Sequence, residues 1–165
     1  MSKTPADARP AKPSIWKAFA QPSASTMFFF GFSSGLPFLL VAGTLAFWLK
    51  DRGIVLKDIT MIASAGMLYA FKFVWAPLLD HWKLPGFAKL GRRRGWLLFS
   101  QLGVMAALLA MAAFTPDRLQ AFVLATLAVA FFGATQDIAV DAYRIEIAPE
   151  SAQGALVATL SLIHI

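Results

Sequence analysis

The sequence predicts an all-α polytopic membrane protein with four transmembrane helices and the start of a fifth. Three observations predict this class. The 165 residues are 58% hydrophobic and only 15% charged, whereas about a quarter of the residues in a soluble domain carry a charge. The apolar residues form runs long enough to cross the ~30 Å hydrocarbon core as helices. The basic residues lie in short segments between these runs, which is typical of membrane topology.

Composition also excludes several functional classes. The formal charge of +6 does not indicate nucleic acid, because the basic residues are divided among the inter-span segments and do not form one patch. The 165 residues include no cysteine, so they offer neither disulfides nor thiolate metal ligands. His81 and His164 are too far apart in sequence for metal-ligand spacing. We therefore expect a lipid bilayer around the protein, and no metal, cofactor or nucleic acid.

The chain begins with a polar, basic tail over residues 1–21, followed by an incomplete transmembrane bundle over residues 22–159. The first span is expected at residues 26–49 and contains the motif G-F-S-S-G-L-P. Pro37 in this motif cannot donate to the helix ladder, and the motif's glycines allow another backbone to approach closely. The motif predicts a kinked helix, used either for gating or for packing alone.

The second span is expected at residues 59–79 and contains Lys72. One interpretation is that the long side chain reaches the membrane interface and is solvated there. The other makes it a fixed cation inside the bundle, available to a carboxylate of the fourth span or to an anionic substrate. A basic loop from His81 to Gly95 leads to the third span at residues 96–114, which has few polar side chains.

The end of the fourth span carries the most informative stretch, F-F-G-A-T-Q-D-I-A-V-D-A-Y-R-I-E at residues 131–146. Asp137, Asp141 and Arg144 fall at helical spacings i, i+4 and i+7, so they share one face. Ionisable residues inside a bilayer are costly and normally face a bundle interior or a wet cavity. The stripe predicts a lined pathway. The alternative is a stripe at the membrane edge that water solvates.

Orientation follows from the distribution of lysine and arginine. The tail, the His81–Gly95 loop and the end of the fourth span together hold ten of these residues, against four on the opposite side. Because cytoplasmic segments carry the excess of basic residues, the N-terminal tail is predicted to be cytoplasmic.

Four segments carry a family resemblance: G-F-S-S-G-L-P, K-F-V-W-A-P-L-L-D, L-G-R-R-R-G-W-L-L and A-T-Q-D-I-A-V-D-A-Y-R. Together they extend from Phe29 to Gly154, and in them the chain resembles the N-terminal part of AmpG-type muropeptide permeases of the major facilitator superfamily. The resemblance implies twelve or more helices in two pseudo-symmetric bundles. It also implies proton-linked import of anhydro-muropeptides, which are cell-wall recycling products, across a bacterial inner membrane.

The resemblance and the charged residues together suggest roles for particular side chains. Asp137 or Asp141 would carry the coupling proton. Lys72, Arg144 and Gln136 would contact the substrate, a sugar-peptide, or pair with the acids.

Asp80 with Arg92 or Arg93 would form a cytoplasmic charge latch, or gate. The ten residues between Asp80 and Gly91 make a longer spacer than the superfamily signature has, however. These arginines could instead serve only as positive-inside topology signals.

Two other classes compete with a secondary transporter. A membrane-embedded enzyme needs a nucleophile with a base, or a metal cluster, and no such group is evident. A membrane scaffold would not need charges inside the membrane. Within the transporter class, permeases for acetyl-coenzyme A or siderophores share related features, so the substrate stays open.

The final six residues, Leu160–Ile165, read L-S-L-I-H-I. One reading frame of a transposase-based sequencing adaptor encodes this hexapeptide. We therefore expect residues 160–165 to be a non-native tail and give His164 no functional role. The alternative is an ordinary apolar fifth helix.

Overall fold

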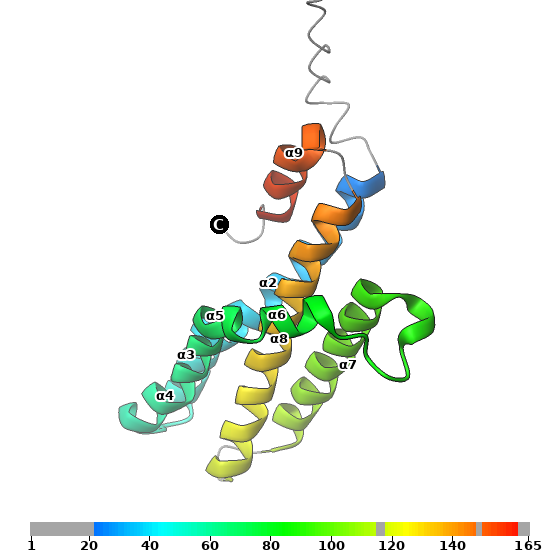
Figure 1. The fold of residues 1–165 in the computed structure, drawn as a ribbon. Coiled ribbons are helices and arrows are strands. Elements are labelled where there is room, and N and C mark those ends of the chain that lie inside the picture. Colours follow the sequence, from blue (N-terminus) through cyan, green and yellow to red (C-terminus); the bar gives the residue numbers. More distant parts are fainter. Residues whose placement is uncertain (1–21, 115–117, 148–149, 162–165) are drawn as a thin grey trace, which may run out of the picture.

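The computed structural model describes residues 22–114, 118–147 and 150–161, and every regular element within these ranges is helical (Figure 1). The α-helices are α2 (Pro22–Leu39), α3 (Leu45–Asp51), α4 (Leu56–Ala63), α5 (Met67–Phe71), α6 (Ala76–His81), α7 (Arg92–Ala113), α8 (Leu119–Ile147) and α9 (Glu150–Ser161). A π-helical turn at Leu40–Thr44 joins α2 to α3, and 3₁₀ turns occupy Ser64–Gly66, Lys72–Val74 and Ala88–Leu90.

Three helical stretches among the described residues are long and apolar enough to cross a membrane: Pro22–Asp51, Arg92–Ala113 and Leu119–Ile147. They correspond to the first, third and fourth predicted spans, and the first and third each begin four residues before the predicted start. The all-helical class of a multi-pass membrane protein is therefore confirmed.

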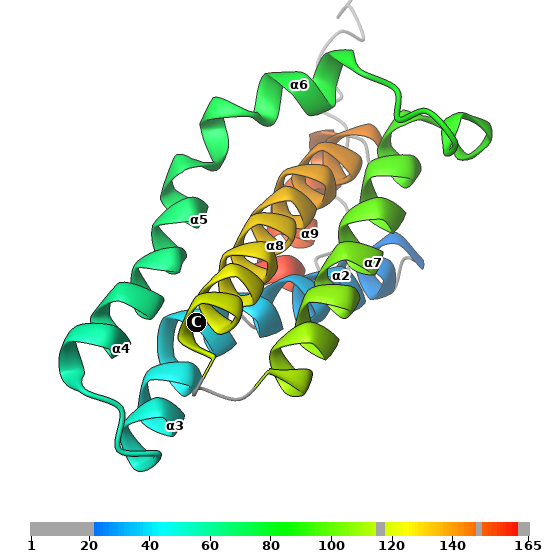
Figure 2. The ribbon, with the colours of Figure 1, turned by 90° about the horizontal axis from the view of Figure 1, so that it is seen from below.

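The second predicted span is helical but broken, so the predicted count of four spans and the start of a fifth is not confirmed. Short helices α4, α5 and α6 alternate with 3₁₀ turns from Leu56 to His81 and form an arc along one side of α8 (Figure 2). Pro77, in the first turn of α6, supplies no backbone N–H, and in a continuous α-helix its ring would clash with the carbonyl group of Phe73, four residues earlier. This explains the break between the Lys72–Val74 turn and α6.

Helix α8 is the centre of the described fold. It contacts α2, α5, α6, α7 and α9 and lies between α7 and the α4–α6 arc (Figure 2). Many of its buried residues are small, including Ala125, Ala130, Ala134 and Ala139. Small residues let neighbouring helices approach closely in a membrane, where dispersion contacts rather than water exclusion hold helices together.

The predicted irregularity of the first span is present. Pro37 is buried inside α2, and the chain passes into the π-helical turn three residues later. Gly133 of α8 lies opposite, where a Cβ atom would collide with the Tyr69 hydroxyl and lie 3.2 Å from Cβ of Pro37. The absence of a side chain at Gly133 therefore lets α2, α5 and α8 meet at one level.

Two predicted segments fall wholly or partly outside the described residues. The tail over residues 1–21 lies outside them. In the suspected adaptor-encoded tail, Leu160 and Ser161 form the end of α9, and residues 162–165, including His164, lie outside the description. Gly31 of α2 packs against the backbone of Leu160.

Replacing Gly133 by alanine should destabilise the protein, because the new Cβ has no room beside Tyr69. We expect a loss of about 1–3 kcal/mol, typical of overpacking, measured as a lower unfolding midpoint in detergent. Gly154→Ala in α9 is the matched control, since no atom lies within 4 Å of its would-be Cβ. Equal midpoints for the two variants would contradict the close packing at Gly133.

Candidate functional site

Consecutive polar residues of α8 bond to neighbouring segments in different directions. The Trp75 indole N–H donates to Oγ1 of Thr135 at 3.2 Å. The Gln136 amide donates to Oγ of Ser33 on α2 at 2.9 Å. Because successive helical residues are rotated by about 100°, Thr135 and Gln136 hold different neighbours. Both side chains are 1% exposed, so these bonds satisfy polar groups that hydrocarbon could not.

Asp137 follows directly and is held by two donors from two segments. Its Oδ2 lies 3.3 Å from Nζ of Lys72, and its Oδ1 accepts a short hydrogen bond from the Ser34 hydroxyl. The Asp137 side chain is 13% exposed and that of Lys72 35%. Opposite charge and hydrogen bonding together offset the cost of removing a carboxylate from water. Sequence reasoning included Lys72 and Asp137 but missed Ser34, whose sequence signal is its place in the G-F-S-S-G-L-P motif of the first span.

Asp141 and Arg144 lie further along α8 and have different surroundings. The Asp141 side chain is 52% exposed, and its Oδ1 is 3.9 Å from Nε of Arg144. Arg144 Nη1 donates to Oε1 of Gln153 on α9 at 2.9 Å. Arg144 therefore ties α8 to α9. The predicted stripe is thus divided, with Asp137 toward Lys72 and Arg144 toward α9.

Two cavities meet at this site. The smaller, about 230 Å³, is lined by Ser34, Lys72, Asp137, Val140, Asp141, Leu160 and Ser161. The larger, about 540 Å³, is lined by Lys72, Phe73, Ala76, Asp80, Arg93, Ile138, Asp141, Ala142, Ile145 and Glu146. Lys72 and Asp141 border both. Gln136 instead lines a separate, mostly apolar cavity with Ser33 and Gln101, so the structure does not bring it to Asp137.

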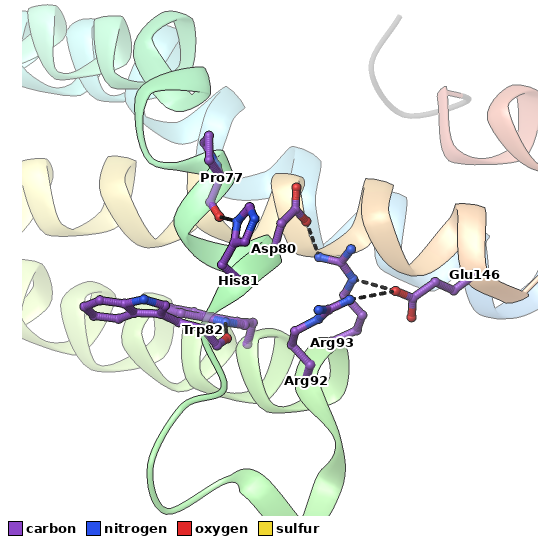
Figure 3. Close-up of polar contacts among 8 residues, drawn as sticks. Pro77, Asp80, His81, Trp82, Arg92, Arg93 and Glu146 are labelled. Carbon is purple, nitrogen blue, oxygen red and sulfur yellow. Dashed lines mark hydrogen bonds and ion pairs between the residues drawn. The ribbon is translucent and has the colours of Figure 1, made fainter.

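A cluster of charged side chains joins three helices (Figure 3), and three of its members, Asp80, Arg93 and Glu146, line the larger cavity. Arg93 donates through Nη1 to Oδ1 of Asp80 at 2.6 Å and through Nε to Oε1 of Glu146 at 2.8 Å. Arg92 lies at 3.8 Å from the same Glu146 oxygen. The arginine fork therefore joins α6, α7 and α8. Glu146 was missed as a site residue, although its place in the last turn of the fourth apolar run was a usable signal.

Local backbone geometry places Arg93. Gly91 precedes α7 with φ +85°, a left-handed value that favours glycine, and Arg92 is the first residue of the helix. The Trp96 indole N–H donates to the carbonyl oxygen of Trp82 at 3.0 Å, which fastens the loop to α7. On the other side of the loop, His81 Nδ1 lies 2.7 Å from the carbonyl oxygen of Pro77 (Figure 3).

Metal chemistry finds no support within the described ranges, where no three histidine, aspartate or glutamate side chains gather closely enough to hold an ion. The arrangement can instead exchange charge partners. A proton arriving at Asp137 would release Lys72, and a change of helix tilt would open the Arg93 contacts.

Comparison with known proteins identifies relatives over most of the chain. The family model described as acetyl-coenzyme A transporter 1 matches residues 26–163. The anhydromuropeptide permease of Escherichia coli K12 is 39% identical over 140 residues, which are 84% of this chain and 28% of the permease. A putative transporter, AmpG 4, of Rickettsia conorii is 37% identical over 80% of this chain and 32% of its own length. An uncharacterised protein of Haemophilus influenzae is 42% identical over 72% of this chain and 28% of its length.

The chain thus spans less than a third of the length of these relatives. No solved structure matches it. The named relatives are permeases or putative transporters, which confirms the resemblance to AmpG-type permeases inferred from the four sequence segments.

The two neighbouring arginines should differ in importance. Arg93→Ala should lower the free energy of unfolding by about 1.5–3 kcal/mol, since it removes two charge-assisted hydrogen bonds and leaves two acids without that partner. Arg92→Ala should change it by less than about 1 kcal/mol, because its contact is long and solvent-exposed. Arg93→Lys should not restore stability, since an ammonium lacks the planar fork. Denaturation of the three variants in detergent measures this, and equal losses for Arg92 and Arg93 would contradict it.

Proposed function

The chain belongs to the family described as acetyl-coenzyme A transporter 1, and on this premise we propose that it forms part of a secondary active transporter importing anhydro-muropeptides together with protons. The transporter would lie in a bacterial inner membrane, with the N-terminal tail in the cytoplasm, and would serve cell-wall recycling. The name of the Escherichia coli relative supports the substrate class, and the positive-inside count supports the orientation.

The observation that carries the proposal is the ion pair between Lys72 and Asp137 beside two cavities. A packing function would be served by apolar side chains, which are often as stable as a buried ion pair of the same volume. Ionisable residues at membrane depth are functional by default, and proton relays in transporters use such carboxylates. This is also the argument against a scaffold.

Of the two acids, the geometry favours Asp137 for the coupling proton. It has little exposure and two fixed partners, so protonation changes its contacts sharply: the carboxylate becomes neutral and its attraction for Lys72 is lost. Asp141 is half-exposed and borders both cavities, which suits direct contact with substrate hydroxyl or ammonium groups. Lys72, once released, would offer its charge to a substrate carboxylate.

The charged cluster of Asp80, Arg93, Arg92 and Glu146 suits a cytoplasmic gate. Alternating access requires contacts that form in one orientation of the helices and break in the other. Asp80 and Glu146 are about half exposed, so water can solvate their carboxylates when the pairs with Arg93 separate. Because Arg93 connects α6, α7 and α8, relative movement of these helices would break its bonds.

A second substrate class is favoured by one observation, the description of the matching family model as an acetyl-coenzyme A transporter. Acetyl-coenzyme A carries phosphate groups, which Lys72 and the cluster arginines could bind. The relatives named as muropeptide permeases or AmpG transporters make the sugar-peptide the first choice.

Uptake into vesicles tests the choice. The full-length protein containing this chain, reconstituted in lipid vesicles, should accumulate labelled anhydro-muropeptide when the outside is acidic, and an ionophore that collapses the proton gradient should abolish accumulation. Asp137→Asn should remove this proton dependence. Accumulation of acetyl-coenzyme A but not of the muropeptide would reject the proposed substrate, and accumulation indifferent to the gradient would reject proton coupling.

The proposed topology predicts which loops are reachable from outside the cell. In a background without other cysteines, Gly53→Cys should react with an impermeant thiol reagent added to intact cells, whereas Lys89→Cys should react only after permeabilisation. Both positions lie in connections between helices. The reverse pattern would invert the orientation.

Lys72 and Asp137 should be energetically coupled. Lys72→Ala alone should lower uptake at least about tenfold, because it strands a carboxylate, and the double variant Lys72→Ala/Asp137→Asn should be less impaired in substrate binding than Lys72→Ala. Binding of labelled substrate at equilibrium measures the recovery. Gln136→Ala combined with Lys72→Ala is the control pair, since the two side chains border different cavities, and its effects should add. Additive losses for the Lys72–Asp137 pair would show that the two act separately.

A further inference from the structure

Ser34 is the polar residue at the centre of the site to which neither the sequence motif nor the proposed transport cycle gives a role. It is 2% exposed. It lies on the buried stripe of α2 with Met27 and Gly31, at helical spacings i, i+4 and i+7. That stripe faces α8 and α9, which both pack against α2. A serine in this position needs a hydrogen-bond partner, because hydrocarbon offers none.

The partner of Ser34 is the carboxylate of Asp137, one of whose oxygens accepts its hydroxyl hydrogen while the other faces Lys72. Each oxygen of the acid is thus fixed by a different element, α2 on one side and the Lys72–Val74 turn on the other. A hydroxyl that donates to a carboxylate favours the ionised acid over the protonated one. It also fixes the rotation of the carboxyl group, so that Oδ2 points to Lys72.

We propose that Ser34 is the positioning residue of Asp137: it fixes the rotation of the carboxyl group and aims Oδ2 at Lys72, and so influences the pH at which Asp137 takes up its proton. This rests on the proposed function, in which Asp137 carries the coupling proton. When the proton from the aqueous side binds the carboxylate, Asp137 becomes neutral and the attraction that holds Lys72 is lost. Ser34 itself neither gains nor loses a proton.

Other charged or ionisable groups around Asp137 also affect its protonation, and they are the same with and without the Ser34 hydroxyl. Lys72 faces it from the 3₁₀ turn, and Tyr69 of α5 is close enough to interact with its charge. On α8 itself the nearest ionisable side chain one turn away is Asp141, which shares the smaller cavity. Helix α9 contributes only the uncharged Leu160 and Ser161 to that cavity. A variant of Ser34 leaves all of these unchanged.

The chain offers a matched control one residue away. Ser33 also bonds α2 to α8, but its partner is the neutral amide of Gln136. Removing either hydroxyl deletes one helix-to-helix hydrogen bond. Removing the Ser34 hydroxyl also takes a donor from a carboxylate. A merely structural role therefore predicts similar behaviour of the two alanine variants, and a positioning role predicts that only Ser34→Ala changes a titration.

The experiment follows the protonation of Asp137 directly, by infrared titration of the full-length protein in lipid vesicles. Uptake of labelled anhydro-muropeptide is measured against external pH in parallel. The carboxyl C=O band that Asp137→Asn removes defines the titration of Asp137. In Ser34→Ala its midpoint should rise by about one pH unit, which corresponds to the loss of one hydrogen bond to a charged group. Ser33→Ala and Ser34→Thr should keep the original midpoint, and the pH of half-maximal uptake should move with the band.

Several outcomes would overturn the proposal. One is an equal midpoint for Ser34→Ala and Ser33→Ala, and another is a shift of the uptake profile that persists when Ser34→Ala is combined with Asp137→Asn. If Ser34→Ala does not reach the membrane, Ser34→Cys, a weaker donor of similar size, should move the midpoint in the same direction, and no movement would count against the role. Failure of the proposed function gives a different result: no muropeptide uptake by the unmodified protein, while the infrared midpoint still responds to Ser34.

Discussion

The described structure depends on accommodating one carboxyl group, that of Asp137, inside an apolar helix bundle. Asp137 is on the central helix α8, and its side chain is only 13% exposed. Such a group needs an opposite charge and hydrogen-bond donors in good geometry, because the desolvation cost is otherwise several kcal/mol. Lys72 and Ser34 supply them from two different segments. The site therefore constrains how α2 and the α4–α6 arc are placed against α8.

This requirement offers a physical explanation for the irregular geometry of the neighbouring segments. Lys72 starts a 3₁₀ turn, and Trp75 follows that turn. Both side chains bond to α8, Lys72 at Asp137 and Trp75 at Thr135. On the other side, α2 contains a buried proline and continues into a π-helical turn, features that are frequent where a membrane helix serves a function. Irregular backbone is tolerated at membrane depth where it is buried in protein or borders a cavity.

The Asp137–Lys72 pair and the Arg93 cluster have different environments, and this difference supports different proposed roles. The Asp137 carboxylate is 13% exposed and has two partners, one of them Lys72 with a 35% exposed side chain, which suits the proposed proton-responsive switch. The Arg93 cluster is wetter on its acidic side, with Asp80 and Glu146 about half exposed, and it joins three helices. Because water reaches the two carboxylates, it can take the place of Arg93 when these pairs separate, as the proposed gate requires. The larger cavity lies between the two groups and is bordered by residues of both.

The sequence by itself determined the helical membrane class, the approximate limits of three long helices and most of the candidate site residues. Hydropathy over some twenty residues and the placement of charges are local properties of the chain, so they can be read without the fold. It also placed Asp137 and Asp141 on one helical face, since helical spacing is regular. The tertiary structure decided which of them meets Lys72, because that depends on how two segments separated by 65 residues approach one another. The partners of Ser34 and Glu146 became visible only there, because they lie on other helices. The broken second segment also could not be read from hydropathy, since its average apolar character is the same whether the backbone forms one helix or several short ones joined by 3₁₀ turns.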